Sequence, residues 1–174
     1  ESFKRFPSPK FWGDQVVYSI MIDRFRNGDP SNDQNNISKN QQNDIANNNF
    51  LDIGKFRHGG DLKGILDRLD YIVDLGATAI MISSPFENNS GDYHGYCVSD
   101  FMKIDPGFGT NDEFRQLVNA AHERGLLVIL DVVVNHFCDV NSGYFNQISS
   151  EQHLKCAYDL SVNESKNIVL DSEY

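Results

Sequence analysis

Three short apolar runs, separated by two helical patterns, dominate the hydrophobic profile of the chain. The runs cover residues 16–22, 79–82 and 126–134 and contain many β-branched side chains. Apolar runs of this length without polar alternation are typical of strands buried on both faces of a sheet. We therefore expect three such strands.

Two amphipathic helices are predicted between these strands. Apolar residues recur at helical spacing from Leu62 to Val73, and Gly76 follows as a C-terminal cap. A second helix is predicted to begin at Thr110, where Thr110 and Glu113 have the spacing of a capping box, and to end at Gly125.

The order strand, helix, strand, helix, strand predicts an α/β fold with right-handed βαβ units and a parallel sheet. Ligand-binding groups in such folds gather at the carboxyl ends of the strands. Polar residues do follow each predicted strand, namely Asp23, Ser83 and the segment 131–136. Segments 24–61 and 84–108 are predicted loops, and the first of them is rich in Asn and Gln.

The net charge of the chain excludes some classes of partner. The chain has 174 residues, with 15 Lys and Arg against 25 Asp and Glu, which gives a net charge of −10. Such an acidic chain is repelled by phosphate backbones and anionic lipids, so nucleic acid and membrane partners are not expected. Its three cysteines allow at most one internal disulfide.

The loop after the first strand is a candidate metal site. Four oxygen-bearing side chains fall within seven residues there: Asn27, Asp29, Asn32 and Asp33. Calcium takes six to eight oxygen ligands from carboxylates, amides and backbone carbonyls. The same composition also describes a solvated polar turn, and the spacing does not match an EF-hand loop.

Two further motifs are candidate sites. One precedes the first predicted helix, and the other lies in the loop after the second predicted strand. In the motif His58–Asp61, the adjacent glycines would let the backbone approach an ion, while Asp61 on its own is suited to be a helix N-cap. In Asp92–Tyr96, tyrosine rings could stack on a sugar and His94 could donate a hydrogen bond. The alternative there is a packed aromatic loop.

The segment 131–136, with the sequence DVVVNH, carries the fourth candidate. A carboxylate within an apolar strand is costly to bury, so Asp131 is expected to have a cationic or hydrogen-bonding partner on a neighbouring strand. His136 lies where a residue of the ligand-binding edge is expected.

Taken together and in this order, these motifs resemble the α-amylase family of glycoside hydrolases and transglycosylases, in particular its cyclodextrin glucanotransferase and α-amylase members. The resemblance rests on these segments: YSIMIDRFRNGDPSND, HGGDLKGILDRLDYIVDLGATAI, YHGY, DFMKIDPGFGTNDEFRQLVNAAHERG and DVVVNH. It implies a (β/α)8 barrel, of which residues 1–136 form the N-terminal part with strands 1 to 3. Residues 137–174 would begin the domain inserted after strand 3.

The resemblance also assigns roles to individual residues. It implies a calcium site formed by Asn27, Asp29, Asn32, Asp33, the carbonyl of Gly59 and Asp61, and makes Asn135 a ligand of a second calcium ion. Substrate-binding roles fall on Tyr96 by stacking, on His136 by a hydrogen bond and on the adjacent His94. Asp131 takes the position of a structural aspartate. One departure is Cys97, because glucanotransferases often have tryptophan there.

The implied activity is retaining cleavage or transfer on α-glucans such as starch and maltodextrins. Two carboxylates carry out such a reaction, and by the family pattern these and a third carboxylate come from strands 4, 5 and 7. None is expected in this chain, so the chain alone is predicted to be inactive. The alternative is a non-catalytic, amylase-like fragment or α-glucan-binding module. Calcium-dependent members of the family are most often exported, so a secreted protein is expected.

Overall fold

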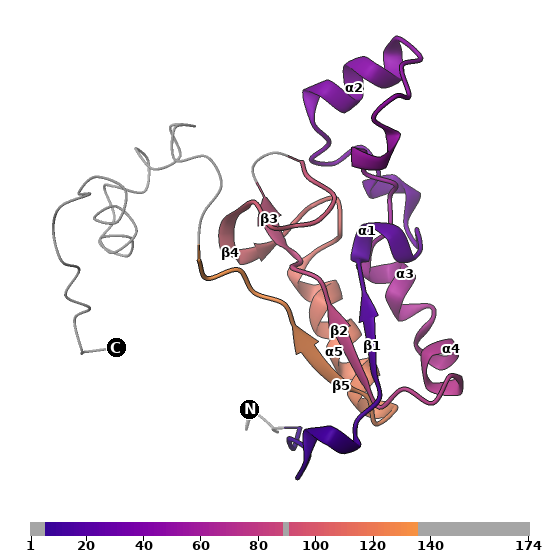
Figure 1. Cartoon of the computed structure of the whole chain (residues 1–174), viewed down its shortest axis with the longest axis vertical. Helices are drawn as coiled ribbons and strands as arrows, with labels where there is room; N and C mark the ends of the chain where they lie inside the picture. The colour runs from indigo at the N-terminus through magenta and orange to yellow at the C-terminus, as the bar shows by residue number, and fades with distance from the viewer. Residues whose placement is uncertain (1–5, 89–90, 136–174) are drawn as a thin grey trace, which may run out of the picture. The chain divides into compact units, whose positions relative to one another are not determined.

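A computed structural model describes residues 6–88 and 91–135 of the chain. Three strands form a parallel sheet in the order β1-β2-β5: β1 Val17–Ile20, β2 Ala79–Ile82 and β5 Leu127–Leu130. Three helices connect them: α3 Leu62–Leu66, α4 Leu69–Asp74 and α5 Asn111–Glu123. The alternation of strand and helix is as predicted, and Figure 1 shows the sheet with its connecting helices.

The remaining elements lie in the two long connections. After β1 the chain forms α1 Ile22–Phe25 and α2 Lys39–Ala46, with short 3-10 turns at Pro30–Asn32 and Ile53–Lys55. Another 3-10 turn, Trp12–Asp14, precedes β1. Between β2 and α5 the chain forms the antiparallel hairpin of β3 Phe86–Asn88 and β4 Val98–Ile104.

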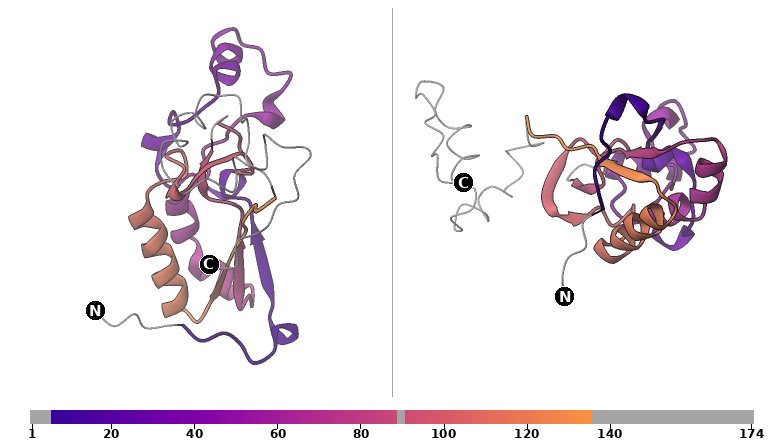
Figure 2. Two further views of the ribbon diagram at one scale, coloured as in Figure 1. Left: turned by 90° about the vertical axis from the view of Figure 1, so that its left-hand side faces the viewer. Right: turned by 90° about the horizontal axis from the view of Figure 1, so that it is seen from below.

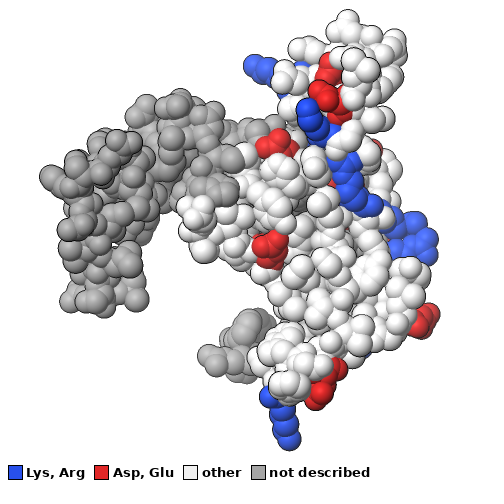
Figure 3. All heavy atoms as spheres, viewed as in Figure 1, with Lys and Arg blue, Asp and Glu red and all other residues white. Residues whose placement is uncertain are grey.

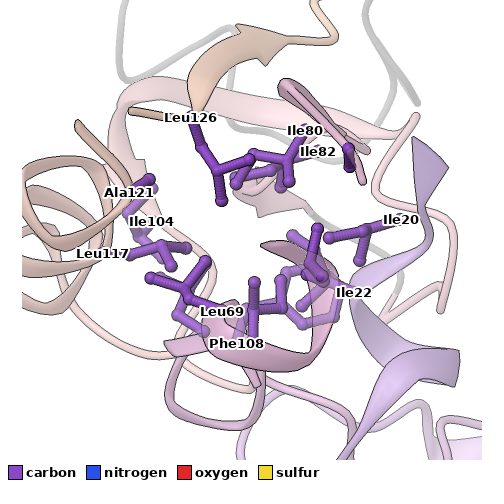
Figure 4. Packing of buried hydrophobic residues seen from close by; sticks show 14 residues of the cluster. Ile20, Ile22, Leu69, Ile80, Ile82, Ile104, Phe108, Leu117, Ala121 and Leu126 are labelled. Carbon is purple, nitrogen blue, oxygen red and sulfur yellow. The ribbon is translucent and has the colours of Figure 1, made fainter. Parts of the chain in front are cut away.

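The core lies between the sheet and the helices, which cover one face of the strands (Figure 2). Ile20, Ile80 and Ile82 project from the sheet, and Leu69 and Leu117 project from the helices to meet them (Figure 4). All five side chains are almost completely buried, so removal of this apolar surface from water stabilises the unit.

β2 has the predicted bounds, but β1 and β5 are shorter than predicted, and the strands are less buried. Val17 in β1 and Met81 in β2 are 44% and 36% exposed, and all four residues of β5 are only half-buried. Successive side chains of a strand point to opposite faces, and the described helices cover only one face. In addition, β1 and β5 pair only with β2 among the described residues. The prediction of strands buried on both faces is therefore wrong for β1 and β5, and in β2 it fails at Met81, although Ala79 is buried.

The helix predicted from Leu62 to Val73 is divided into α3 and α4 at Asp67 and Arg68. The apolar stripe nevertheless continues through the break, because Ile65 and Leu69 on its two sides are both fully buried. The second helix is confirmed: Thr110 and Glu113 form the reciprocal capping box of α5.

The segment 84–108 is predicted to be a loop, but part of it forms the hairpin of β3 and β4. Two register shifts interrupt the pairing of these strands, at Phe86/Glu87 and Glu87/Asn88. Such irregularities disturb the alternation of apolar and polar residues from which a strand is recognised.

A buried ion pair attaches the Asn-rich loop to this hairpin. Arg57 Nη1 lies 2.7 Å from Asp105 Oδ1, and the two side chains are 3% and 0% exposed. The second carboxylate oxygen of Asp105 accepts hydrogen bonds from the side-chain amides of Asn36, at 2.6 Å, and Asn88, at 2.8 Å. Gln41 in α2 exchanges two hydrogen bonds with the Arg57 backbone. The long polar segment is therefore held by specific buried contacts.

Charged side chains are unevenly distributed on the face drawn in Figure 3, where Lys and Arg form a line over α1 to α4. Arg24, Arg26 and Arg68 line a hollow of about 500 Å³ together with Tyr18, Phe25 and Tyr71. No helix among the described residues is long and apolar enough to cross a membrane.

Candidate functional site

The carboxyl ends of the three parallel strands bring the predicted polar residues to one edge of the sheet. The Ser83 amide donates to the carbonyl of Ile20, and the Asp131 amide donates to the carbonyl of Ile82. The Ser83 hydroxyl in turn accepts the Ile22 amide at 3.1 Å. Segments that follow the strands are thus tied to one another, as the parallel topology predicts.

His94 and Tyr96, to which the resemblance assigns sugar binding, form a stacked pair beside this edge; the pair is here called the sugar platform after that prediction. Their ring centroids are 5.4 Å apart with an interplanar angle of 19°, and the Tyr96 amide donates to His94 Nδ1 at 3.0 Å. Tyr96 remains 36% exposed. A partly exposed aromatic face beside an imidazole can stack on the apolar face of a sugar ring while a ring nitrogen makes a hydrogen bond.

Asp131 orients the sugar platform. The Tyr96 hydroxyl donates to Asp131 Oδ2 at 2.9 Å, and this bond is the main cause that raises the pKa of Tyr96 above its ordinary value. The predicted hydrogen-bonding partner of Asp131 therefore exists, but it lies in the loop before β4 and not on a strand. The prediction that Asp131 is buried within a strand is wrong, because the residue follows β5 and is half-exposed.

Replacing Asp131 with Asn should lower the pKa of Tyr96. Asparagine replaces the charge-assisted hydrogen bond to the carboxylate with a weaker bond to a neutral amide oxygen and also removes the negative charge, so the protonated phenol is stabilised less. Spectrophotometric titration of tyrosinate should then show one tyrosine ionising at a lower pH in Asp131→Asn than in the parent chain. Tyr96→Phe identifies that tyrosine by removing its signal, and Asp112→Asn is the control. An unchanged titration curve would contradict the importance of this contact.

The loop 27–33 and the turn 58–61 converge, as the resemblance implied. The six groups assigned to calcium are here called the oxygen cluster: Asn27, Asp29, Asn32, Asp33, the carbonyl of Gly59 and Asp61. Asn27 Nδ2 donates to Asp33 Oδ1 at 2.7 Å, and the Asp29 amide donates to Asp61 Oδ2 at 2.8 Å. At Gly59 (φ +86°) a Cβ atom would lie 2.6 Å from Asp33 Oδ1, so only glycine allows this approach.

Two amide oxygens of the oxygen cluster fit a cation. Asn27 Oδ1 and Asn32 Oδ1 are buried and accept no hydrogen bond from any described residue. A buried acceptor without a partner costs about 1–3 kcal/mol, and calcium binds amide oxygens of this kind. The described residues contain no group of three or more His, Cys, Asp and Glu side chains suited to a metal. A metal here would therefore need the amide and carbonyl oxygens of the oxygen cluster in addition to its carboxylates.

Asp61 is confirmed as the N-cap of α3. Its Oδ1 accepts the Gly64 amide at 2.6 Å, and both oxygens accept the Gly28 amide at 3.0–3.1 Å. Asn32 Nδ2 approaches Asp61 Oδ2 at 3.4 Å. Asp61 thus joins the two loops whether or not it also contacts a metal, and its role as a ligand stays a prediction.

Asp29 also has a local role. Its carboxylate accepts the Ser31 amide at 3.0 Å, and hydrogen bonds from Ser31 are the main cause that lowers the Asp29 pKa.

Asn135 is exposed near the end of the described range. His136 lies outside the described residues, so the substrate-binding role implied for it stays a prediction.

Sequence reasoning placed Asp23 at the ligand-binding edge and Tyr93 in a candidate sugar-binding motif, but it identified no partner for either residue and did not single out Arg24. Buried Asp23 accepts the backbone amides of His58 and Gly59, and burial is the main cause that raises its pKa. Arg24 and Tyr93 contact each other at the rim of the same region. A carboxylate directly after a buried strand, together with a Gly-Gly turn elsewhere, was the available signal for Asp23. No sequence pattern indicated the Arg24–Tyr93 contact.

This arrangement is that of an α/β barrel segment with its polar groups at the carboxyl ends of the strands. The sequence matches the alpha-amylase family, described as alpha amylase, catalytic domain, over residues 19–167, and the chain belongs to this family. Its fold is the N-terminal portion of the family's (β/α)8 barrel.

Individual relatives agree with this assignment. The periplasmic alpha-amylase of Escherichia coli K12 is 38% identical over 172 residues, which is 91% of this chain and 24% of that protein. The solved alpha-amylase of Anoxybacillus is 43% identical with a TM-score of 0.66, covering 82% of this chain and 28% of that one. The alpha-amylase of Geobacillus thermoleovorans, solved in complex with acarbose, is 32% identical with a TM-score of 0.62. That match covers 94% of this chain and 30% of the Geobacillus chain. The chain therefore spans less than a third of each of these relatives.

Proposed function

We propose that this chain is the N-terminal part of a retaining α-glucan hydrolase or transglycosylase and carries half of a sugar subsite. The observation that supports this most directly is the sugar platform of His94 and Tyr96, fixed by the Tyr96–Asp131 hydrogen bond at the carboxyl ends of the strands. His136 would add a hydrogen bond to the same sugar.

The reaction would be completed by carboxylates outside this chain. A retaining glycosidase needs two carboxyl groups about 5 Å apart on either side of the scissile bond. The contacts of Asp131 serve to hold Tyr96, so we assign it a positioning role and no part in bond cleavage.

Oligosaccharide binding without cleavage is the expected behaviour of the 174-residue chain. Calorimetry with maltotriose should detect binding that is lost in Tyr96→Ala and retained in Tyr71→Ala, a tyrosine in α4 that is 48% exposed. The purified chain should release no reducing sugar from starch. Release of reducing sugar would contradict the proposed location of the carboxylates, and equal loss of binding in both variants would contradict the sugar platform.

We further propose calcium as the metal of the oxygen cluster. The amide oxygens of Asn27 and Asn32, the carboxylates of Asp29, Asp33 and Asp61 and the Gly59 carbonyl would hold it, and Asn135 would serve a second ion. The two buried amide oxygens without partners among the described residues support the first site. The ion would fix the loop after β1 against the turn before α3.

We also propose that the protein is secreted. A relative named periplasmic alpha-amylase supports this proposal.

Calcium should raise the melting temperature of the chain. A ligand at about 100 times its Kd adds about 2.7 kcal/mol to the free energy of unfolding when it binds only the folded state. Thermal melts with excess calcium and with EGTA should differ in the parent chain, and the difference should disappear in Asp29→Ala. Asp112→Ala, which removes an acidic residue from the first turn of α5, should keep it. A parent chain whose melt is the same in both conditions would contradict the site.

A further inference from the structure

Arg24, in α1, contacts residues that adjoin both candidate sites, although it touches no member of the oxygen cluster or the sugar platform itself. Its guanidinium carbon lies 4.2 Å from the centroid of the Tyr93 ring. Its Nε lies 3.2 Å from Asp23 Oδ2, and its Nη2 donates to the carbonyl of Gly54 at 2.8 Å. A guanidinium within about 6 Å of an aromatic face is attracted to it, so one side chain holds an aromatic ring and a buried carboxylate at once.

On the oxygen-cluster side, Arg24 acts through Asp23. The Asp23 carboxylate accepts the His58 amide at 2.9 Å and the Gly59 amide at 3.3 Å, and its backbone carbonyl accepts the Gly60 amide at 3.0 Å. The turn that presents the Gly59 carbonyl is therefore held by the residue to which Arg24 is paired. These hydrogen bonds join the turn at Gly59 to the residue whose carboxylate pairs with the Arg24 guanidinium.

On the sugar side, Arg24 acts through a series of rings. Tyr93 meets His94 edge to face, with centroids 5.3 Å apart and an interplanar angle of 70°. His94 then stacks on Tyr96, whose hydroxyl is bonded to Asp131. The contacts run without interruption from the turn at Gly59 to the exposed ring of Tyr96.

We propose that Arg24 and Tyr93 are positioning residues that couple the oxygen cluster to the sugar platform, so that a divalent cation bound at the first strengthens oligosaccharide binding at the second. The cation restricts the turn at Gly59 and thereby Asp23 and the Arg24 guanidinium. Arg24 in turn restricts Tyr93 and the His94–Tyr96 pair. Because coupling free energies are reciprocal, the oligosaccharide also strengthens cation binding. This inference rests on the proposed function.

The experiment is calorimetry of maltotriose binding to the 174-residue chain, in calcium and in EGTA. We expect the parent chain to bind maltotriose about fivefold more tightly in calcium, at the lower end of typical couplings. Tyr93→Leu removes the ring between Arg24 and His94 and should reduce this ratio to about one. Direct calcium titration should show that Tyr93→Leu binds the ion with parental affinity. Tyr93→Phe, which keeps the ring, should restore the fivefold ratio.

Each outcome is decisive. A parent chain that binds both ligands with a ratio of one overturns the coupling and leaves the proposed function intact. Retention of the ratio in Tyr93→Leu overturns the route through Tyr93. If the parent chain binds no maltotriose in either condition, the sugar platform fails and the coupling with it. Similar melting temperatures for Tyr93→Leu and Tyr93→Phe show that a loss of coupling is not a loss of folding.

Discussion

Arg57→Met is expected to destabilise the chain by about 3–5 kcal/mol, the cost of removing one partner from a buried ion pair. Methionine retains most of the length of the side chain but leaves the fully buried Asp105 carboxylate without its cation. The variant also loses the hydrogen bonds from Arg57 to the carbonyls of Gly91 and Asp92, and the cation–π contact with Phe108 at 4.6 Å. The melting temperature should fall by on the order of 10 °C.

Arg115→Met provides the matched control. Arg115 is also paired with an aspartate, Asp112, but these side chains are 70% and 82% exposed, and exposed ion pairs contribute little. Chemical denaturation should separate the two variants clearly. If Arg57→Met unfolds at the same denaturant concentration as Arg115→Met, the Arg57–Asp105 pair does not hold the Asn-rich loop on the hairpin.

Gly95→Ala should disrupt the sugar platform. Gly95 lies between His94 and Tyr96 at φ +76°, and a Cβ atom there would be 2.1 Å from the backbone oxygen of Ser84. Alanine pays about 1–3 kcal/mol for the left-handed backbone, and a further 1–3 kcal/mol or so for forcing Ser84, which is fully buried, to move. The melting temperature and maltotriose affinity should both fall, and the raised pKa of Tyr96 should return toward its ordinary value as the bond to Asp131 is lost.

Gly125→Ala separates the cost of the left-handed backbone from the cost of the steric contact with Ser84. Gly125 has the same φ of +76°, but no described atom beyond Gly125 and its two chain neighbours lies within 4 Å of its Cβ position. This variant should show only the backbone penalty and keep maltotriose affinity. Equal destabilisation by the two substitutions would mean that the contact with Ser84 does not position the loop.

Features of the fold that depend on neighbouring residues in the sequence were predicted well. The apolar runs located all three parallel strands, and the capping box at Thr110 located the start of α5, because both signals arise within a single element. The hairpin β3–β4 was missed because its pairing is irregular, and the break between α3 and α4 was missed because the apolar stripe crosses it unchanged.

For the candidate sites as well, the sequence indicated the residues, whereas the structure gave their contacts. Residue types, together with the resemblance to the α-amylase family, indicated which residues form the oxygen cluster and the sugar platform, and the ligand and sugar-binding roles of these residues stay predictions. The sequence alone left the role of Asp61 open, and the structure shows an N-cap with hydrogen bonds from Gly28, Asp29 and Gly64. It also placed the partner of Asp131 on a strand, whereas the partner is Tyr96, 35 residues away in a loop.

By itself, the sequence determined the α/β class, the succession of strands and helices, the family and the set of candidate ligands. The class and the succession of elements follow from local periodicity, whereas the family and the full set of candidate ligands follow from the resemblance of five segments in the same order to the α-amylase family. Only the tertiary structure decided which oxygen atoms are left without hydrogen bonds, that Arg57 neutralises Asp105 and that Arg24 bridges Asp23 and Tyr93. These features depend on side chains distant in sequence meeting in an environment of low polarity, where an unpaired charge or acceptor is costly.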